Sequence, residues 1–453
     1  MKRQTSQDIL AEDFRNLLFP LHRRPFPDLD DTYELELAFY EHRLLTDDEL
    51  LGNGAYFAQV GADWTRHYRI CTGDALKLPD DSSRLKSFFI RNIFRTGYAT
   101  HGLFPYRGKF HPQMIKALLN IMGLKPGQTV LDPMMGSGTT LIEASIMGIN
   151  SVGIDASPFC RFMTQTKIDA LTMSLKRAHG ALVNHQEVFS YFQSKVGAPI
   201  VGSKSSGKRI SKDLDRLMEP PADYNTPQRS QSLQRQDTID TYHFLLLAYL
   251  DSAGYAERSQ RKTPLAQFRV VLERYLFVAE KFQKILHESP WLLGAAKVIE
   301  GDARSFPLEN ASIDGIIFSP PYSFAIDYLA NDAFHLHFMG IEEETLRNKM
   351  IGLRGRTLAD KFGYYDEDMG SVLSECGRVL KPGKFCTVII GTNNNQLSKV
   401  LGVPPDEVAG LHERLQEKGA NYGLRIVKSM SRPITGIANT MRREYILVFQ
   451  RGG

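Results

Sequence analysis

The chain has 453 residues, enough for one large domain or two to three smaller ones with a substantial core. Lys and Arg number 55 against 51 Asp and Glu, so we expect any nucleic-acid-binding surface to be a local patch rather than a global field. The sequence lacks a run of about 18 apolar residues, and its first residues, MKRQTSQDILAED, lack an apolar signal core. We therefore expect a cytoplasmic protein without a membrane partner.

The first segment, residues 1–95, combines an acidic stretch, DLDDTYELELAFYEHRLLTDDELL, with the sequence SSRLKSFFIRNIF at 82–94. The spacing of apolar residues in the second stretch predicts a helix. We expect residues 1–95 to form an N-terminal helical cap.

A glycine-rich loop follows a short apolar strand predicted at 129–131. Asp132 ends this strand, and Gly136, Ser137 and Gly138 let the backbone pass close to a ligand before a helix begins near Thr139. The spacing differs from GxGxxG, and the lysine of a Walker loop is missing. A lone loop of this kind could hold any nucleotide.

Two further predicted strands end in residues suited to a nucleoside. The strand SVGID ends at Asp155, where a carboxylate can accept hydrogen bonds from the two hydroxyls of a ribose. The strand in KVIEGDAR ends just before Asp302 and Ala303, which we expect near an adenine.

About 140 residues separate Asp155 from the third strand, far more than the single crossover helix that a doubly wound sheet needs. We expect an insertion that begins with a helix over 163–196 and ends with an amphipathic helix from Thr263, with Pro264 in its first turn. Between them lies a polar stretch with a basic cluster, the candidate for DNA contact; a solvated loop is the alternative. Its residues are Lys204, Lys208, Arg209 and Lys212. A second basic cluster, Arg432, Arg442 and Arg443, could touch phosphates or be surface charge.

An apolar run, DGIIF, leads directly into Ser319, Pro320, Pro321 and Tyr322. Each proline lacks a backbone N–H and fixes φ, so the strand must end rigidly at this point. The Ser319 hydroxyl and the Pro320 carbonyl can accept hydrogen bonds from a planar NH2 group, and Tyr322 offers a face for stacking. These properties indicate chemistry on an amino group; an ordinary turn is the alternative.

The four cysteines argue against two other kinds of site. Cys71, Cys160, Cys376 and Cys386 show no CxxC spacing, so the sequence predicts no metal site and no disulfide framework. Methylation at cytosine C5 uses a nucleophilic cysteine, usually in a Pro-Cys pair, and the chain contains no such pair.

The loops DPMMGSGTT and SPPY resemble, without gaps, the two signatures of the S-adenosylmethionine-dependent N4-cytosine/N6-adenine DNA methyltransferases. FPYRGKFHPQM at 104–114 is similar to the segment that closes over the methionine end of the cofactor in many of these enzymes. RVLKPGKF at 378–385 is similar to the lead into their fifth strand. The resemblance covers roughly residues 100–170 and 295–450.

This resemblance implies an α/β class I (Rossmann-like) fold with about seven strands and an antiparallel last strand. The catalytic domain would comprise 96–170 and 295–453, with an insertion over 171–294 as the candidate DNA-recognition region. The implied cofactor is S-adenosylmethionine, and the implied catalytic residues are Ser319, Pro320, Pro321 and Tyr322. The implied cofactor-binding residues are Phe110, Asp132, Pro133, Gly136, Ser137, Gly138, Thr139, Thr140, Asp155, Asp302 and Ala303.

The resemblance implies methyl transfer to the exocyclic amine of a flipped base in double-stranded DNA. Serine before Pro-Pro-Tyr favours cytosine N4. Three alternatives stay open: adenine N6 in DNA, an RNA amino group, and a non-catalytic DNA-recognition subunit. A restriction nuclease or another defence-system protein would be a fitting partner.

Overall fold

The computed structural model describes residues 14–29, 31–72, 89–90, 93–106, 108–195, 231–258, 263–322, 327–434 and 443–453. Within these ranges, no helix is long and apolar enough to cross a membrane.

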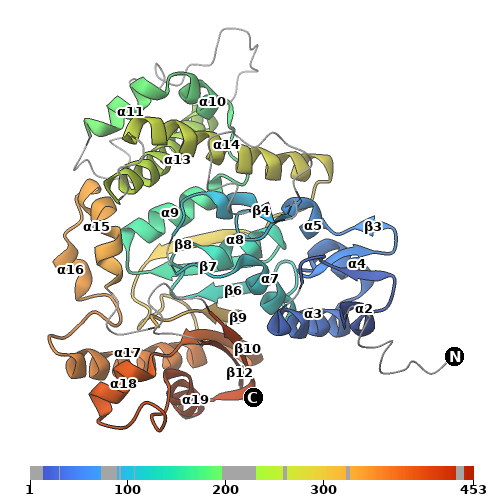
Figure 1. Ribbon diagram of the computed structural model, residues 1–453, viewed down its shortest axis with the longest axis vertical. Helices are drawn as coiled ribbons and strands as arrows, with labels where there is room; N and C mark the ends of the chain where they lie inside the picture. Colours follow the sequence, from blue (N-terminus) through green and yellow to red (C-terminus); the bar gives the residue numbers. More distant parts are fainter. Residues whose placement is uncertain are drawn as a thin grey trace.

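A seven-stranded sheet forms the centre of the protein (Figure 1). Its strands are β6 (Thr129–Asp132), β7 (Asn150–Asp155), β8 (Ala296–Glu300), β9 (Ile313–Phe318), β10 (Leu380–Gly391), β11 (Leu424–Pro433) and β12 (Arg443–Arg451), in the order β11-β12-β10-β9-β6-β7-β8. Strands β6 to β10 pair in parallel, whereas β12 is antiparallel to both of its neighbours. The α/β sheet of about seven strands with an antiparallel last strand is therefore confirmed.

Helices cover both faces of this sheet because successive side chains of a strand point to opposite faces. Val130 of β6 packs in the cluster that contains α7 (Pro112–Ile121) and part of the N-terminal segment. Its neighbour Leu131 packs on the other face with α17 (Leu358–Val379) and α19 (Leu411–Asn421). All six residues of β9 are buried, which explains the continuous apolar run before Ser319. The remaining helices near the sheet are α8 (Thr139–Ile146), α9 (Pro158–Asp169), α15 (Tyr328–Phe338), α16 (Glu343–Arg347) and α18 (Asn394–Leu401).

The N-terminal segment contains strands as well as the expected helices. Its elements are α2 (Phe14–Leu18), β1 (Arg23–Pro25), α3 (Thr32–Leu44), α4 (Asp47–Asn53), β2 (Phe57–Val60), β3 (Asp63–Trp64), α5 (Arg66–Cys71), β4 (Phe89–Ile90) and β5 (Ile93–Phe94), and the 3-10 helix η1 (Ala99–Gly102) follows it. β1, β2 and β3 form a separate sheet. The helix predicted over 82–94 is wrong where that range is described, because β4 pairs with β5 as antiparallel strands. Their Phe and Ile residues favour strands, and Ile93 and Phe94 are buried.

The inserted residues form a helical layer, which Figure 1 shows gathered at one end of the molecule. Its helices are α10 (Lys176–Val183), α11 (His185–Gln193), α13 (Gln231–Arg258) and α14 (Pro264–Glu288). The predicted helix from Thr263 is confirmed as α14, whose N-cap hydroxyl accepts a hydrogen bond from the Ala266 N–H at 3.3 Å. The single helix predicted over 163–196 is instead divided into α9, α10 and α11. Thr172 and Ser174 lie at the first break, and such residues compete with helical hydrogen bonding.

The layer packs against α9 and against the chain segment that precedes α7. The Phe104 N–H donates to the Tyr275 hydroxyl of α14 at 2.8 Å, and α13 and α14 share one hydrophobic cluster with α9. The basic cluster predicted to contact DNA, Lys204, Lys208, Arg209 and Lys212, lies outside the described residues, as does Arg442.

Candidate active site

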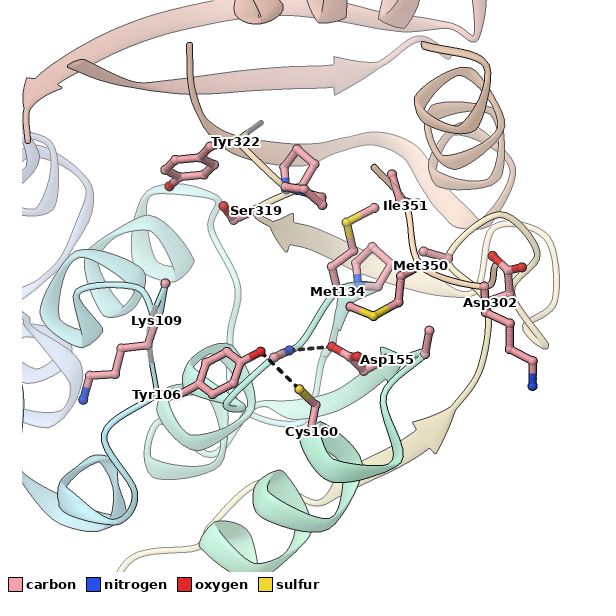
Figure 2. A pocket seen from close by; sticks show the side chains of 18 of the residues that line it. Tyr106, Lys109, Met134, Asp155, Cys160, Asp302, Ser319, Tyr322, Met350 and Ile351 are labelled. Atoms are coloured by element: carbon pink, nitrogen blue, oxygen red, sulfur yellow. Dashed lines mark hydrogen bonds between the residues drawn. The ribbon is translucent and has the colours of Figure 1, made fainter. Parts of the chain in front are cut away.

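A cavity of about 230 Å³ lies at the carboxyl ends of β6, β7, β8 and β9. The strand order reverses between β6 and β9, and in open α/β sheets ligands bind in the crevice at such a reversal. Nine of the residues predicted for the cofactor and for catalysis line this cavity: Pro133, Gly136, Asp155, Asp302, Ala303, Ser319, Pro320, Pro321 and Tyr322. Figure 2 shows Ser319 and Tyr322 on one side of the cavity and Asp155, Cys160 and Tyr106 on the other.

The glycine loop is anchored to the tip of the neighbouring strand β7. The Gly136 N–H donates to Asp155 Oδ2 at 2.9 Å, and the Met135 N–H donates to the Ile154 carbonyl at 3.0 Å. Gly138 has φ of +76°, and a Cβ there would lie 2.5 Å from Thr164 Cγ2, so only glycine fits. The close packing of the loop against α9, which contains Thr164, thus explains why residue 138 is a glycine.

The other predicted cofactor residues do not line the cavity. Ser137, Thr139 and Thr140 are buried behind it at the start of α8, and Phe110 packs with the cluster beneath the N-terminal segment. Asp132 is fully buried and accepts a hydrogen bond from the Met134 N–H at 3.1 Å. Burial raises the pKa of its carboxyl to about 7.

Asp155 keeps free hydrogen-bonding capacity toward the cavity. Its Oδ2 accepts from Gly136, and its Oδ1 accepts from the Ser157 N–H at 2.9 Å. A carboxylate offers about four lone pairs, so each oxygen can accept one more bond, which is the arrangement that a pair of ribose hydroxyls requires. Burial raises the pKa of this carboxyl, while the two N–H bonds lower it.

Asp302 is paired with Arg304, whose Nη2 lies 2.7 Å from Asp302 Oδ2. The pKa of Asp302 is lowered below its ordinary value: burial alone would raise it, but the hydrogen bonds from Arg304 outweigh that effect. Arg304 Nη1 also lies 3.1 Å from Asp368 Oδ1 on α17, which fixes the guanidinium. Arg304 thereby connects the end of β8 to α17.

The Ser-Pro-Pro-Tyr loop begins directly after β9 ends at Phe318. The Tyr365 hydroxyl of α17 donates to the Pro321 carbonyl at 3.0 Å, and the Tyr322 hydroxyl donates to Glu444 Oε1. Burial and the adjacent Glu444 carboxylate raise the pKa of Tyr322 well above its ordinary value, so the phenol stays protonated.

Several lining residues lie outside the predicted set: Tyr106, Gly108, Lys109, Met134, Ala156, Cys160, Lys349, Met350, Ile351 and Glu444. Tyr106 lies within the segment FPYRGKF, so the resemblance could have included it; Cys160 Sγ donates to its hydroxyl at 3.5 Å. Lys349 to Ile351 and Glu444 belong to stretches without a motif, and the sequence carries no signal for them.

Two cationic side chains at or beside the cavity, Lys109 and Arg432, are engaged by other groups of the protein. Lys109 Nζ donates to the carbonyls of Thr96 at 2.7 Å and His101 at 3.1 Å, and burial lowers its pKa to about 8. Arg432, for which phosphate contact and surface charge were the two alternatives, is partly buried against Glu444, to which its Nε donates. Its guanidinium is paired with a carboxylate inside the protein, so neither alternative describes its main contact.

The sheet order, the antiparallel β12 and the cavity at the strand reversal define the class I methyltransferase fold. Consistent with this fold, the family described as UPF0020, RMKL-like, methyltransferase domain matches residues 103–194.

Individual relatives are also methyltransferases. The type II methyltransferase M.MjaII of Methanocaldococcus jannaschii is 29% identical over 194 residues, which is 42% of this chain and 32% of the relative. The type II methyltransferase M.BsoBI of Geobacillus stearothermophilus is 22% identical over 281 residues, 54% of each chain. This chain therefore spans only a third to about half of the length of these two relatives.

Two further similarities are shorter or weaker. A tRNA (guanine(10)-N2)-dimethyltransferase of Methanothermobacter thermautotrophicus is 42% identical over 52 residues, 12% of this chain and 16% of that protein. A solved SAM-dependent methyltransferase from Methanosarcina mazei is 10% identical, covering 73% of this chain and 94% of its own, with a TM-score of 0.31.

Proposed function

We propose that the protein transfers a methyl group from S-adenosylmethionine to the exocyclic amine of a DNA base, with cytosine N4 preferred. The observation that carries the proposal is a single cavity that brings Gly136 and Asp155 together with Ser319 and Tyr322, although these residues are far apart in the sequence. The similarity to two type II methyltransferases supports DNA as the substrate.

The residues of the cavity fit the cofactor. Asp155 offers acceptors for the ribose, Gly136 lets the backbone approach closely, and Ala303, Met350 and Ile351 supply apolar contact for an adenine. Bound S-adenosylmethionine supplies a sulfonium methyl group that is already activated for transfer.

The protein's own contribution is alignment of the amine. The Ser319 hydroxyl and the Pro320 carbonyl accept hydrogen bonds from the two N–H groups, and Tyr322 stacks on the base. The amine of a paired base is enclosed in the duplex, so the target nucleotide must be flipped into the cavity. No covalent intermediate with the protein is needed.

The decisive experiment incubates the protein with methyl-labelled cofactor and either double-stranded DNA or tRNA, followed by mass spectrometry of the nucleosides. We expect label on N4-methylcytosine. Label on N6-methyladenine would show that the target base is adenine and not cytosine. Label on a tRNA guanine, the substrate in the name of the tRNA methyltransferase relative, would show that the substrate is RNA and not DNA. If neither nucleic acid were labelled, the alternative of a non-catalytic recognition subunit would be favoured.

A further inference from the structure

We propose that Glu444 and Arg432 are positioning residues for Tyr322, fixing the ring in the orientation that receives the target base. This inference deepens the proposed function and rests on it. Neither residue belongs to a motif, and both lie more than 100 residues beyond Tyr322 in the chain, Glu444 by 122.

The first observation is a continuous line of polar contacts behind Tyr322, on the side of the cavity where Ser319 and Tyr322 lie. The Tyr322 hydroxyl donates to Glu444 Oε1, and Arg432 Nε donates to Glu444 Oε2. Glu444 lines the cavity yet is only 4% exposed. One oxygen of its carboxylate thus binds the Ser-Pro-Pro-Tyr loop, and the other binds the sheet.

The second observation is the rigidity of the site from which Glu444 acts. Arg432 of β11 and Glu444 of β12 are directly opposite each other in the antiparallel ladder, and β12 lies between β10 and β11. Side chains directly opposite on neighbouring strands are close enough to interact. The carboxylate is therefore held by a strand that is paired on both sides, whereas Tyr322 follows two prolines that cannot donate to a ladder.

The third observation is charge compensation. A buried carboxylate without a partner is costly, and the Arg432 guanidinium supplies the opposite charge. On its other side, Arg432 Nη1 donates to the Tyr33 hydroxyl of α3 at 3.4 Å and lies over the Tyr33 ring, 5.4 Å from its centroid. The N-terminal segment thereby supports the arginine from outside the sheet.

These contacts affect chemistry because stacking fixes the base only if the ring itself is fixed. A bond at the hydroxyl, the atom farthest from the backbone, sets the tilt of the ring. A displacement of about 1 Å in a catalytic site can reduce the rate by about 100-fold. We therefore expect losses in kcat rather than in cofactor binding.

The test is a double-mutant cycle on methyl transfer to double-stranded DNA of mixed sequence with methyl-labelled S-adenosylmethionine. Tyr322→Phe removes only the hydroxyl, and Glu444→Met removes the acceptor at similar side-chain length. Each variant is expected to lower kcat by about 10- to 100-fold. The double variant is expected to lose less activity than the product of the two single losses, because both changes break the bond between Tyr322 and Glu444. The affinity for S-adenosylmethionine, measured by calorimetry, should be unchanged.

Further variants separate positioning from folding. Arg432→Lys should retain more activity than Arg432→Met, since the lysine keeps a charge beside Glu444. The matched control is Arg425→Met, at an exposed arginine on the same strand β11, which should keep the parental kcat. If Glu444→Met does not fold, Tyr322→Phe and the two Arg432 variants decide the question together, because the Tyr322 hydroxyl also contacts the Ser319 side chain and Arg432 acts only through Glu444.

Unchanged kcat in Tyr322→Phe, or losses that multiply in the double variant, would overturn the proposal. So would losses that only follow the folded fraction in thermal unfolding. A parent protein that methylates no DNA would instead refute the proposed function, and the proposal with it.

Discussion

At the scale of single residues, Asp155 connects the glycine loop to the strand tip and still offers acceptors to a ligand. We predict that Asp155→Ala weakens S-adenosylmethionine binding by about 1 to 3 kcal/mol, because the ribose hydroxyls lose a charged acceptor. Calorimetry measures the affinity, and circular dichroism establishes that the variant is folded. Unchanged affinity in a folded variant would contradict the assignment.

Asp132 allows a test of burial through pH. Its pKa is raised from 3.8 to about 7 in the folded protein, so between these values the folded state keeps a proton that the unfolded chain loses. Stability from this group therefore falls as pH rises through that window. An asparagine side chain cannot ionise, so the gain in unfolding free energy of Asp132→Asn over the parent should grow from about pH 4 to about pH 7 and then level off. Urea unfolding of both proteins across this pH range measures the difference in unfolding free energy. A difference that shrinks as the pH rises would refute a raised pKa.

At the scale of elements, the start of α8 depends on a left-handed glycine in close contact with α9. Gly138→Ala should destabilise the protein by more than the about 1 to 2 kcal/mol of the backbone conformation alone, because the new Cβ meets Thr164. The control is Gly127→Ala, which has a φ of +84° and no atom within 4 Å of its Cβ. Equal losses in urea unfolding would show that the contact with Thr164 relaxes freely.

The polar part of the insertion remains a prediction from the sequence. If Lys204, Lys208, Arg209 and Lys212 bind phosphates, replacing all four with Gln should flatten the dependence of log binding constant on log salt by about 0.9 for each phosphate that is no longer neutralised. Cofactor affinity should stay the same. A slope equal to that of the parent would leave the segment as a solvated loop.

At the scale of the whole molecule, a buried ion pair joins α13 and α14, the two long helices of the helical layer. Arg274 of α14 donates to Asp251 of α13, and each side chain is 1% exposed. Removing one partner of a buried pair typically costs about 3 to 5 kcal/mol, so Arg274→Met should strongly lower the free energy of unfolding. On the same helix, Arg269 forms an exposed pair with Glu273, and Arg269→Met should cost less than about 1 kcal/mol. Comparable losses in the two variants would mean that the buried pair is not a structural link.

The sequence by itself determined the features that depend on neighbouring residues. The apolar run of β9 before two prolines, the glycine turn into α8 and the start of α14 at Pro264 are local, so propensity and steric limits were sufficient to predict them. The sheet of about seven strands with an antiparallel last strand followed from the resemblance of two motifs.

Only the tertiary structure decided which distant residues complete the cavity. Glu444 reaches Tyr322 because β12 inserts between β10 and β11, and Lys349 to Ile351 reach the cavity from the segment between α16 and α17. Burial also decided the role of Asp132, which supports the loop from behind, and pairing with Glu444 decided the role of the partly buried Arg432. Pairing between strands and burial depend on contacts between residues far apart in the chain, and a local pattern carries no information about them.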